Sequence, residues 1–142
     1  MIPDKVKIEA IIKELKPILR LMNWEIDFDF CDEYRMKDLT GDGDNLAACS
    51  KNLNINYAHI YMKPDGKQAE DWYNTLVHEL YHLVTSDWKY HASSMLNYVK
   101  DEAAHDKENN MLTAYYEQAT DSLARIFCTV YPVTNFNHIL EG

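Results

Sequence analysis

Cysteine is scarce in this sequence, and its distribution does not suggest a disulfide framework. The three cysteines, Cys31, Cys49 and Cys128, are widely spaced and odd in number. Such usage favours a reducing compartment over a secreted fold that depends on disulfides. We therefore interpret the three side chains as packing residues and expect a cytoplasmic protein.

Long hydrophobic runs are missing as well. No stretch of about 18 apolar residues occurs, so the sequence predicts no membrane-spanning helix. The residues after Met1 are charged and lack the apolar core of a signal peptide, so we expect no targeting segment.

Basic residues are outnumbered by acidic ones, 14 to 23, which gives a formal net charge of −9. A field of this sign repels phosphate backbones and anionic lipid surfaces. Nucleic acid and membranes are therefore poor candidates for partners. The 142 residues are 46% hydrophobic, enough for one core, and we predict a single domain over residues 1–142.

Hydrophobic periodicity divides the first half of the chain into a helix and strands. Residues 3–22 repeat apolar side chains at three- and four-residue steps, and Pro17 should kink or end that helix. Residues 24–30 alternate large apolar with acidic side chains, the pattern of a strand with one face on the core. Residues 46–62 fit a hairpin of two strands, or one bulged strand, and residues 37–45 fit a surface loop.

A helical period returns in the second half. The predicted helices run from Gln68 to about Ser86, from His91 to about Ala104, and from Met111 to the residue before Pro132, with a polar break at residues 106–110. Strands segregated from helices in this order are typical of an α+β fold. We expect a small three-stranded sheet, mixed or antiparallel, packed against the helix over 68–86 and the C-terminal helices.

The helix over 68–86 contains the sequence TLVHELYH, which has HExxH spacing. His78 and His82 are four residues apart and share a helix face, so both imidazoles can turn towards one point. Glu79 lies on the same turn, within reach of a water on a metal, and can act as a general base. Zinc suits such a site because it accepts imidazole nitrogens and leaves a position for water. Two surface histidines at this spacing by chance are the alternative, but the apolar flanks favour a buried metal site.

A catalytic zinc needs a third protein ligand. The extended motif HExxHxxGxxH is excluded, because Thr85 and Trp88 occupy the positions of its glycine and third histidine. His91 and His105 remain candidates, although each is more typical of a surface histidine.

Glu117 and Asp121 are the other candidates, and they have a feature that the histidines lack. The two carboxylates lie one helical turn apart on the same face, so one can bind the metal while the other orients a ligand. An orienting carboxylate is common, because it fixes the tautomer of a metal-bound histidine. Asp121 could do this for His78 or His82.

These two motifs, HExxH followed on a later helix by ExxxD, resemble the gluzincin group of zinc metallopeptidases. The wider order, over roughly residues 24–131, is similar to the minimal members of that group, small proteins of bacteria and their phages. The resemblance implies a zincin-like fold and Zn²⁺ bound by His78, His82 and Glu117. It also implies that Glu79 activates the water that attacks a peptide carbonyl, and that Asp121 holds the first histidine.

The same resemblance implies a protein or peptide substrate that pairs with a sheet edge, here expected at the strand from Ile55 to Met62. The family also uses a His, Tyr or Arg to stabilise the oxyanion, and no motif identifies that residue here. The candidates are Tyr90, His91, Tyr115 and Tyr116.

A second hypothesis is a non-catalytic or latent metal-binding module, with a regulatory or interaction role, that retains the zincin fold. The helix over residues 91–104 would then cover the site as a lid. A protease for DNA-bound proteins is a third hypothesis, which the negative charge and the lack of a basic patch disfavour.

Overall fold

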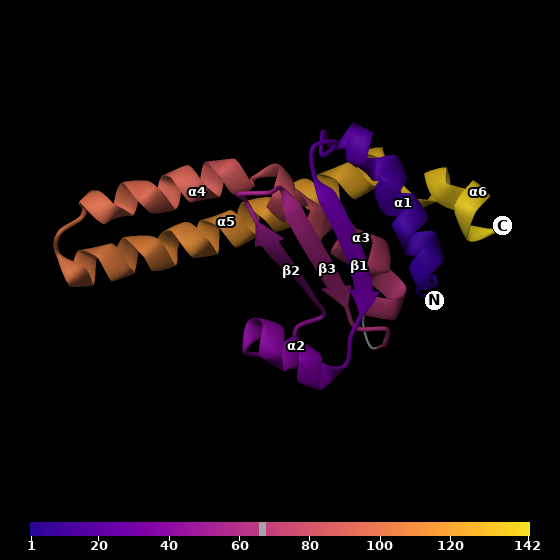
Figure 1. Ribbon diagram of the computed structural model, residues 1–142, viewed down its shortest axis with the longest axis horizontal. Helices are drawn as coiled ribbons and strands as arrows, with labels where there is room; N and C mark the ends of the chain where they lie inside the picture. The colour runs from indigo at the N-terminus through magenta and orange to yellow at the C-terminus, as the bar shows by residue number, and fades with distance from the viewer. Residues whose placement is uncertain (66–67) are drawn as a thin grey trace.

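The strands of the protein lie in the first half of the chain and the long helices mostly in the second (Figure 1). The computed structural model describes residues 1–65 and 68–142. The elements are α1 (Lys5–Ile18), β1 (Glu25–Phe30), α2 (Glu33–Thr40), β2 (Ala47–Asn52), β3 (Tyr57–Met62), α3 (Gln68–Val84), α4 (Ser86–Met95), η1 (Leu96–Tyr98), α5 (Glu102–Val130), η2 (Val133–Phe136) and α6 (Asn137–Leu140). An α+β fold with a small mixed sheet is thereby confirmed.

The sheet has the strand order β1–β3–β2, with β1 parallel and β2 antiparallel to β3. The predicted hairpin is confirmed as β2 and β3. The prediction that the strand ending at Met62 forms the sheet edge is wrong, because β3 is hydrogen-bonded on both sides and β2 lies at the edge. Alternation of side chains indicates which residues face the core, but it does not indicate which strands become neighbours.

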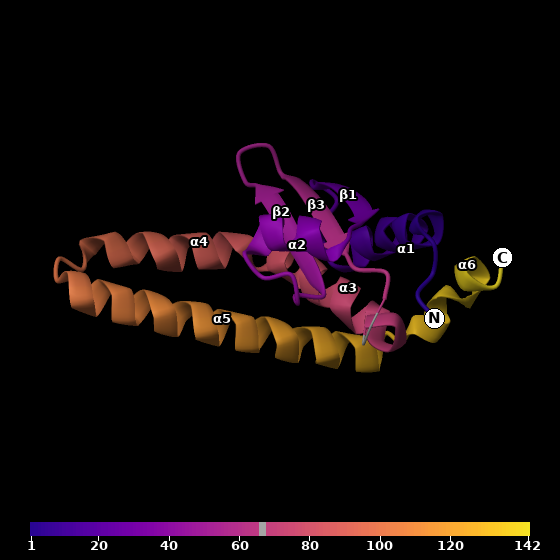
Figure 2. The same ribbon diagram turned by 90° about the horizontal axis from the view of Figure 1, so that it is seen from below.

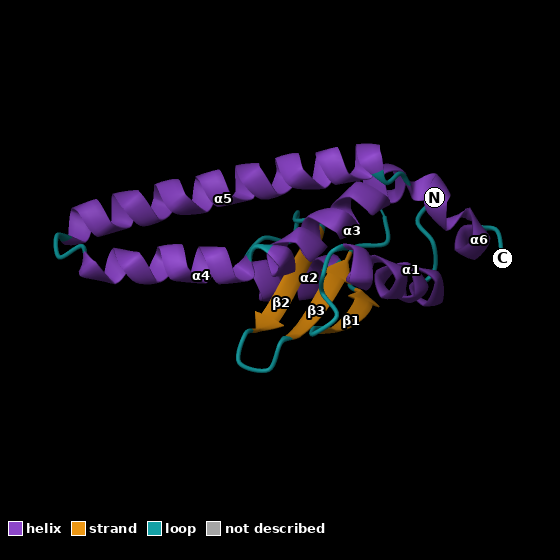
Figure 3. Cartoon of the chain, turned by 90° about the horizontal axis from the view of Figure 1, so that it is seen from above, coloured by secondary structure: helices purple, strands orange, loops and turns teal. Residues whose placement is uncertain are grey.

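Helices cover one face of the sheet. Phe28, Ile60 and Met62 point from this face into the core and are almost fully buried. Helices α1 and α3 lie against it, and α5 packs on the far side of α3 (Figure 3). The core cluster includes Ile8, Ile11, Leu15, Leu76, Leu80, Ala124 and Phe136. Each large apolar side chain buried there contributes about 1.5–3 kcal/mol to folding.

Capping residues set the bounds of the two short N-terminal helices. Helix α1 ends at Ile18, directly after Pro17, as predicted. Helix α2 includes residues 37–40, which we expected to belong to a loop. The Asp32 carboxylate caps its start by accepting a hydrogen bond from the Arg35 backbone N–H at 2.8 Å. Gly41, with φ 82°, ends it in the left-handed conformation.

The two predicted helices after α3 are present with different bounds. Helix α4 begins at Ser86 rather than His91, and α5 is one helix of 29 residues that continues through the polar break predicted at 106–110. An exposed helix needs no apolar period, and the Asp101 side chain caps its start by accepting from Ala104 N at 2.9 Å. Figure 2 shows α4 and α5 side by side as a hairpin that projects beyond the sheet. Among the described residues, even α5 is not apolar enough to cross a membrane.

Candidate metal centre

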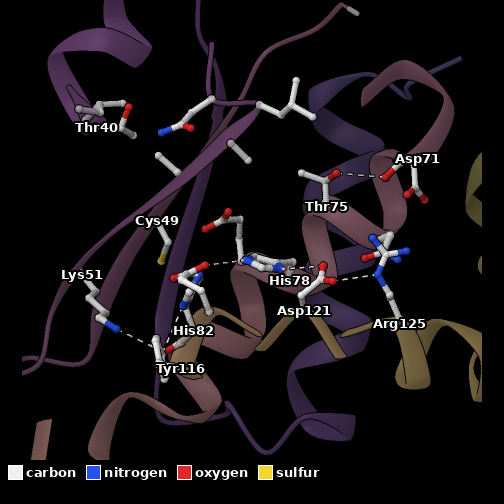
Figure 4. A pocket seen from close by; sticks show the side chains of 18 of the residues that line it. Thr40, Cys49, Lys51, Asp71, Thr75, His78, His82, Tyr116, Asp121 and Arg125 are labelled. Atoms are coloured by element: carbon white, nitrogen blue, oxygen red, sulfur yellow. Dashed lines mark hydrogen bonds and ion pairs between the residues drawn. The ribbon is translucent and has the colours of Figure 1, made fainter. Parts of the chain in front are cut away.

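Helix α3 carries the core on one face and a polar group on another. Leu76 and Leu80 are fully buried in the core. His78, Glu79 and His82 instead line a pocket of about 710 Å³. This pocket lies between α3, α5, the edge strand β2 and the loop that precedes it (Figure 4). The helical period of 3.6 residues separates the two sets, so one helix serves both.

Helix α5 brings the carboxylate of Glu117 to the two imidazoles. Its Oε2 atom lies 3.5 Å from Nε2 of His78, and its Oε1 atom lies 3.4 Å from Nε2 of His82. The imidazole rings stand edge to face, with their centroids 4.9 Å apart. The structure therefore brings together the three side chains that the sequence singled out as metal ligands.

These separations fit a tetrahedral ion. Zinc lies about 2.0–2.2 Å from nitrogen and oxygen ligands, so ligand atoms in a tetrahedral shell are about 3.3–3.5 Å apart. The two contacts of Glu117, at 3.4 and 3.5 Å, involve different carboxylate oxygens, and each is of this length. Two imidazoles and a carboxylate suit zinc or a similar transition metal better than Mg²⁺ or Ca²⁺, which prefer oxygen ligands.

A second carboxylate lies near the same histidines. The candidate ligand atoms of His78, Glu79 and His82 all lie within 4.8 Å of one another. Glu117 approaches both Nε2 atoms at 3.5 Å or less, so two carboxylates, those of Glu79 and Glu117, lie within reach of an ion held by the histidines.

The Nδ1 atom of His78 faces Asp121, on the side of the ring away from Glu117. The distance from Nδ1 to Asp121 Oδ1 is 3.7 Å. The other carboxylate oxygen, Oδ2, accepts a hydrogen bond of 2.9 Å from Arg125 Nε (Figure 4). Asp121 is thus held in place by its neighbour one turn along α5, where it can orient the first histidine.

The Nδ1 atom of His82 faces the hydroxyl of Tyr116. Oη lies 3.2 Å from Nδ1, 3.2 Å from the backbone carbonyl oxygen of His82 and 2.9 Å from Thr85 Oγ1. A hydroxyl has one proton and two lone pairs. The Tyr116 hydroxyl can donate to the His82 carbonyl oxygen and accept from Nδ1–H of the His82 ring. The Nε2 atom of His82 then carries no proton, and its lone pair faces Glu117. The side chain of Tyr116, which is only 2% exposed, is well placed to fix this tautomer.

Burial shifts the pKa values of two groups in the pocket. It raises the pKa of Glu79 to about 7 and lowers the pKa of His82 to about 4, so His82 is neutral at physiological pH. The hydrogen bond between His78 and Glu117 raises the pKa of the imidazole and lowers that of the carboxylate. Without a metal, the pocket thus combines a neutral imidazole, an ionised carboxylate and a buried carboxyl group that titrates near neutrality.

The other candidates from the sequence lie away from this pocket. His91 is exposed on α4, and His105 has its Nδ1 atom 3.6 Å from Asp106 at the start of α5. Tyr90 and Tyr115 are each about 60% exposed and do not line the pocket. Neither histidine lines the pocket, and of the four oxyanion candidates Tyr116 is the one that reaches it.

Sequence reasoning missed several residues that line the pocket. Arg125 could have been found, because Asp and Arg at i and i+4 form ion pairs on a helix. Lys51 on β2 and Lys89 on α4 had no local signal, since only the packing of those elements brings them to the histidines. Cys49 also lines the pocket, and burial raises the pKa of its thiol to about 12, so the thiol is protonated at neutral pH in the metal-free site.

No protein-family model matches the sequence, and no curated protein and no solved structure matches the chain. A functional assignment must therefore be argued from the site itself.

Proposed function

We propose that this protein is a zinc-dependent metallopeptidase of the gluzincin type. The observation that carries the proposal is the position of the Glu117 carboxylate, 3.4 and 3.5 Å from the Nε2 atoms of the HExxH histidines. His78, His82 and Glu117 would hold the zinc ion. Two ligands come from adjacent turns of one helix and the third from another helix, so a folded chain is needed to assemble the set.

A zincin-like fold is part of this proposal. It is supported by the relation of three elements: the motif helix α3 packs beneath the sheet, the strand β2 borders the pocket as a sheet edge, and the later helix α5 supplies the third ligand. The resemblance noted in the sequence implies a sheet before the motif helix and a later helix with the third ligand, although it placed the sheet edge at β3. The order of elements and the site geometry therefore support a single interpretation.

The reaction follows from the groups around the ion. Bound zinc would supply Lewis acidity, which makes a water molecule acidic enough to lose a proton near pH 7. Glu79 would accept that proton, because its carboxylate is buried beside the two histidines and lines the same pocket. The water oxygen would add to the peptide carbonyl carbon. As the C–N bond breaks, Glu79 would pass the proton to the leaving amine nitrogen.

The edge strand β2 would hold the substrate. Its outer edge is unpaired within the described sheet, and Ala47, Ala48 and Cys49 line the pocket. An extended peptide can add to such an edge through main-chain hydrogen bonds, which explains how a small domain could bind a polypeptide. The strand is thus β2, and not the central strand β3 that the sequence suggested.

A lid over the site would explain a latent enzyme, and α4 does not supply one. Helix α4 lies along α5 and projects beyond the sheet with it, and Lys89 is its contribution to the pocket lining among the described residues (Figure 3). The expectation that the helix over 91–104 forms a lid is therefore wrong. A metal-binding module without turnover remains the alternative that the following experiment decides.

The test combines metal analysis with two variants. X-ray absorption of the purified protein should report zinc bound by two imidazole nitrogens and a carboxylate. Glu79→Gln should retain zinc and lower the hydrolysis of a broad peptide library by about 10²–10⁴-fold, the usual contribution of a general base. Glu117→Gln should lose zinc, whereas Glu108→Gln, an exposed glutamate on the same helix, should change neither property. Zinc bound by the native chain with no cleavage of any peptide would establish the non-catalytic module instead.

A further inference from the structure

Two lysines from different elements meet at one end of the pocket. Lys51 on β2 places its Nζ atom 3.3 Å from the backbone carbonyl oxygen of His82. Lys89 on α4 places its Nζ atom 4.8 Å from the ring centroid of Tyr116, which itself contacts His82. Figure 4 shows Lys51, His82 and Tyr116 together, on the side of the pocket away from Arg125. The His82 end of the pocket therefore carries two ammonium groups beside the proposed metal ligands.

These two ammonium groups have no anionic partner of their own. Neither Lys51 nor Lys89 forms an ion pair with any carboxylate that the structure describes, whereas Arg125 at the opposite end is paired with Asp121 at 2.9 Å. Two like charges that face one cleft repel each other, and an anion placed between them removes that cost. The acidic side chains of the pocket near this end, Glu117 and Glu79, belong to the proposed zinc centre, so neither is a dedicated partner of the lysines.

The direction of β2 indicates which part of a bound peptide would reach the lysines. The strand runs from Ala47 to Asn52 along the pocket. An antiparallel peptide would place its N-terminal residues beside Lys51 and its C-terminal residues beside Ala47. Cys49 lines the same pocket as His78 and His82, and Figure 4 shows its side chain beside His82, at the level of the proposed zinc centre. Lys51 is two residues further along the same face of β2, on the N-terminal side of the bond to be cleaved.

We propose that Lys51 and Lys89 form a subsite for an acidic side chain located one or two residues before the scissile peptide bond. The inference rests on the proposed peptidase function and names its substrate class, peptides with Asp or Glu at that position. A free C-terminal carboxylate has the same chemistry, but it would reach the lysines only if the peptide bound parallel to β2. The two sources of a carboxylate can therefore be separated by experiment.

The test uses a matched set of peptides with the zinc-loaded protein. Each sequence cleaved in a library is remade with Glu or Gln before the scissile bond, and with a free or amidated C-terminus. The native protein should favour Glu over Gln by at least about tenfold in kcat/KM, the effect expected of a charged hydrogen bond. The Glu-to-Gln ratio should fall in Lys51→Met and in Lys89→Met and approach one in the double variant. Lys107→Met, which removes an exposed lysine on α5, should keep the native ratio.

A binding measurement makes the test independent of turnover. Fluorescence anisotropy with the Glu79→Gln variant should show tighter binding of the Glu peptide, and the difference should shrink with added salt. Equal affinity for the Glu and Gln peptides, or no binding of either, would overturn the subsite. A preference for the free C-terminus that depends on the lysines would overturn it in favour of a terminal carboxylate. A preference for Glu in binding without hydrolysis would support the subsite while contradicting the peptidase function.

Discussion

Replacing Tyr116 with phenylalanine removes one oxygen atom and tests how the second histidine is oriented. The hydroxyl lies 3.2 Å from His82 Nδ1 and 3.2 Å from the carbonyl oxygen of the same residue. Without it, the imidazole has no acceptor for an Nδ1 proton at this position, and the alternative tautomer directs a proton from Nε2 towards Glu117. Loss of such a partner typically weakens metal binding about 10–100-fold. We expect the zinc dissociation constant of Tyr116→Phe to rise by that factor.

The same substitution has a structural effect that must be measured separately. Tyr116 is 2% exposed, so the phenylalanine ring fills the same space and no large cavity forms. The carbonyl of His82 loses one donor but keeps Lys51 Nζ at 3.3 Å. We expect a loss of about 1–3 kcal/mol in the free energy of unfolding, the usual cost of a buried polar group left without its partner. Urea unfolding in the presence of a chelator reports this quantity without a contribution from metal.

Zinc affinity is best measured by competition with a chelating dye at fixed pH. The matched control is Tyr115→Phe, which removes the hydroxyl of the neighbouring tyrosine, 61% exposed and outside the pocket. The control should bind zinc as the native chain does. A Tyr116→Phe variant that is folded and binds zinc with native affinity would refute the reasoning, because the hydroxyl would then have no influence on the tautomer of His82.

Two further predictions concern other parts of the molecule. The hydrogen bond from Lys5 and the contact with His59 lower the pKa of Asp29 in the folded protein. The ionised carboxylate therefore stabilises the fold at any pH above the pKa it has in the unfolded chain. This stabilisation is lost as the pH falls through the lower pKa of the folded state. Because Asp29 is exposed, Asp29→Asn should lower the free energy of unfolding by less than about 1 kcal/mol at pH 7. In urea titrations, the difference in stability between variant and native protein should vanish near pH 2. A difference that stays constant with pH would contradict this prediction. Burial raises the pKa of Cys49 to about 12, so alkylation of its thiol at pH 8 should be far slower in the folded than in the urea-unfolded protein. Mass spectrometry of the peptide that contains Cys49 measures both rates. Equal rates would mean that the thiol is accessible and ionised in the folded protein.

The local elements of the fold were predictable from the sequence, whereas the strand order was not. Alternation over residues 24–30 and the change of phase within residues 46–62 are properties of a strand and its nearest neighbour, and both are confirmed. The parallel pairing of β1 with β3 joins segments that are separated by α2 and β2, and no local pattern encodes it. The continuity of α5 was missed for a related reason. An exposed helix has no core-facing period over its first turns, so its polar residues read as a break.

The candidate site divides in the same way. Helical spacing is sufficient to relate His78 to His82, and Glu117 to Asp121, because each pair lies on a single helix. Their convergence also requires the packing of α3 against α5, which the sequence suggested only through a family resemblance. Tyr116 shows the limit of spacing arguments. It precedes Glu117 by one residue, and only its burial against α3 brings its hydroxyl to Nδ1 of His82.

Helix α3 contributes side chains both to the core and to the candidate metal site, and this determines how mutations of the site should be interpreted. Leu76 and Leu80 hold the helix in the core, whereas His78 and His82 are only partly buried and face the pocket. Replacing either histidine removes a candidate ligand without opening a cavity in the core, so the apo chain should remain folded. Replacing Leu80 with alanine should cost about 2–5 kcal/mol and disturb the ligands as well, because they are on the same helix. Loss of zinc with an intact fold therefore identifies a ligand, while loss of both properties identifies the scaffold that positions it.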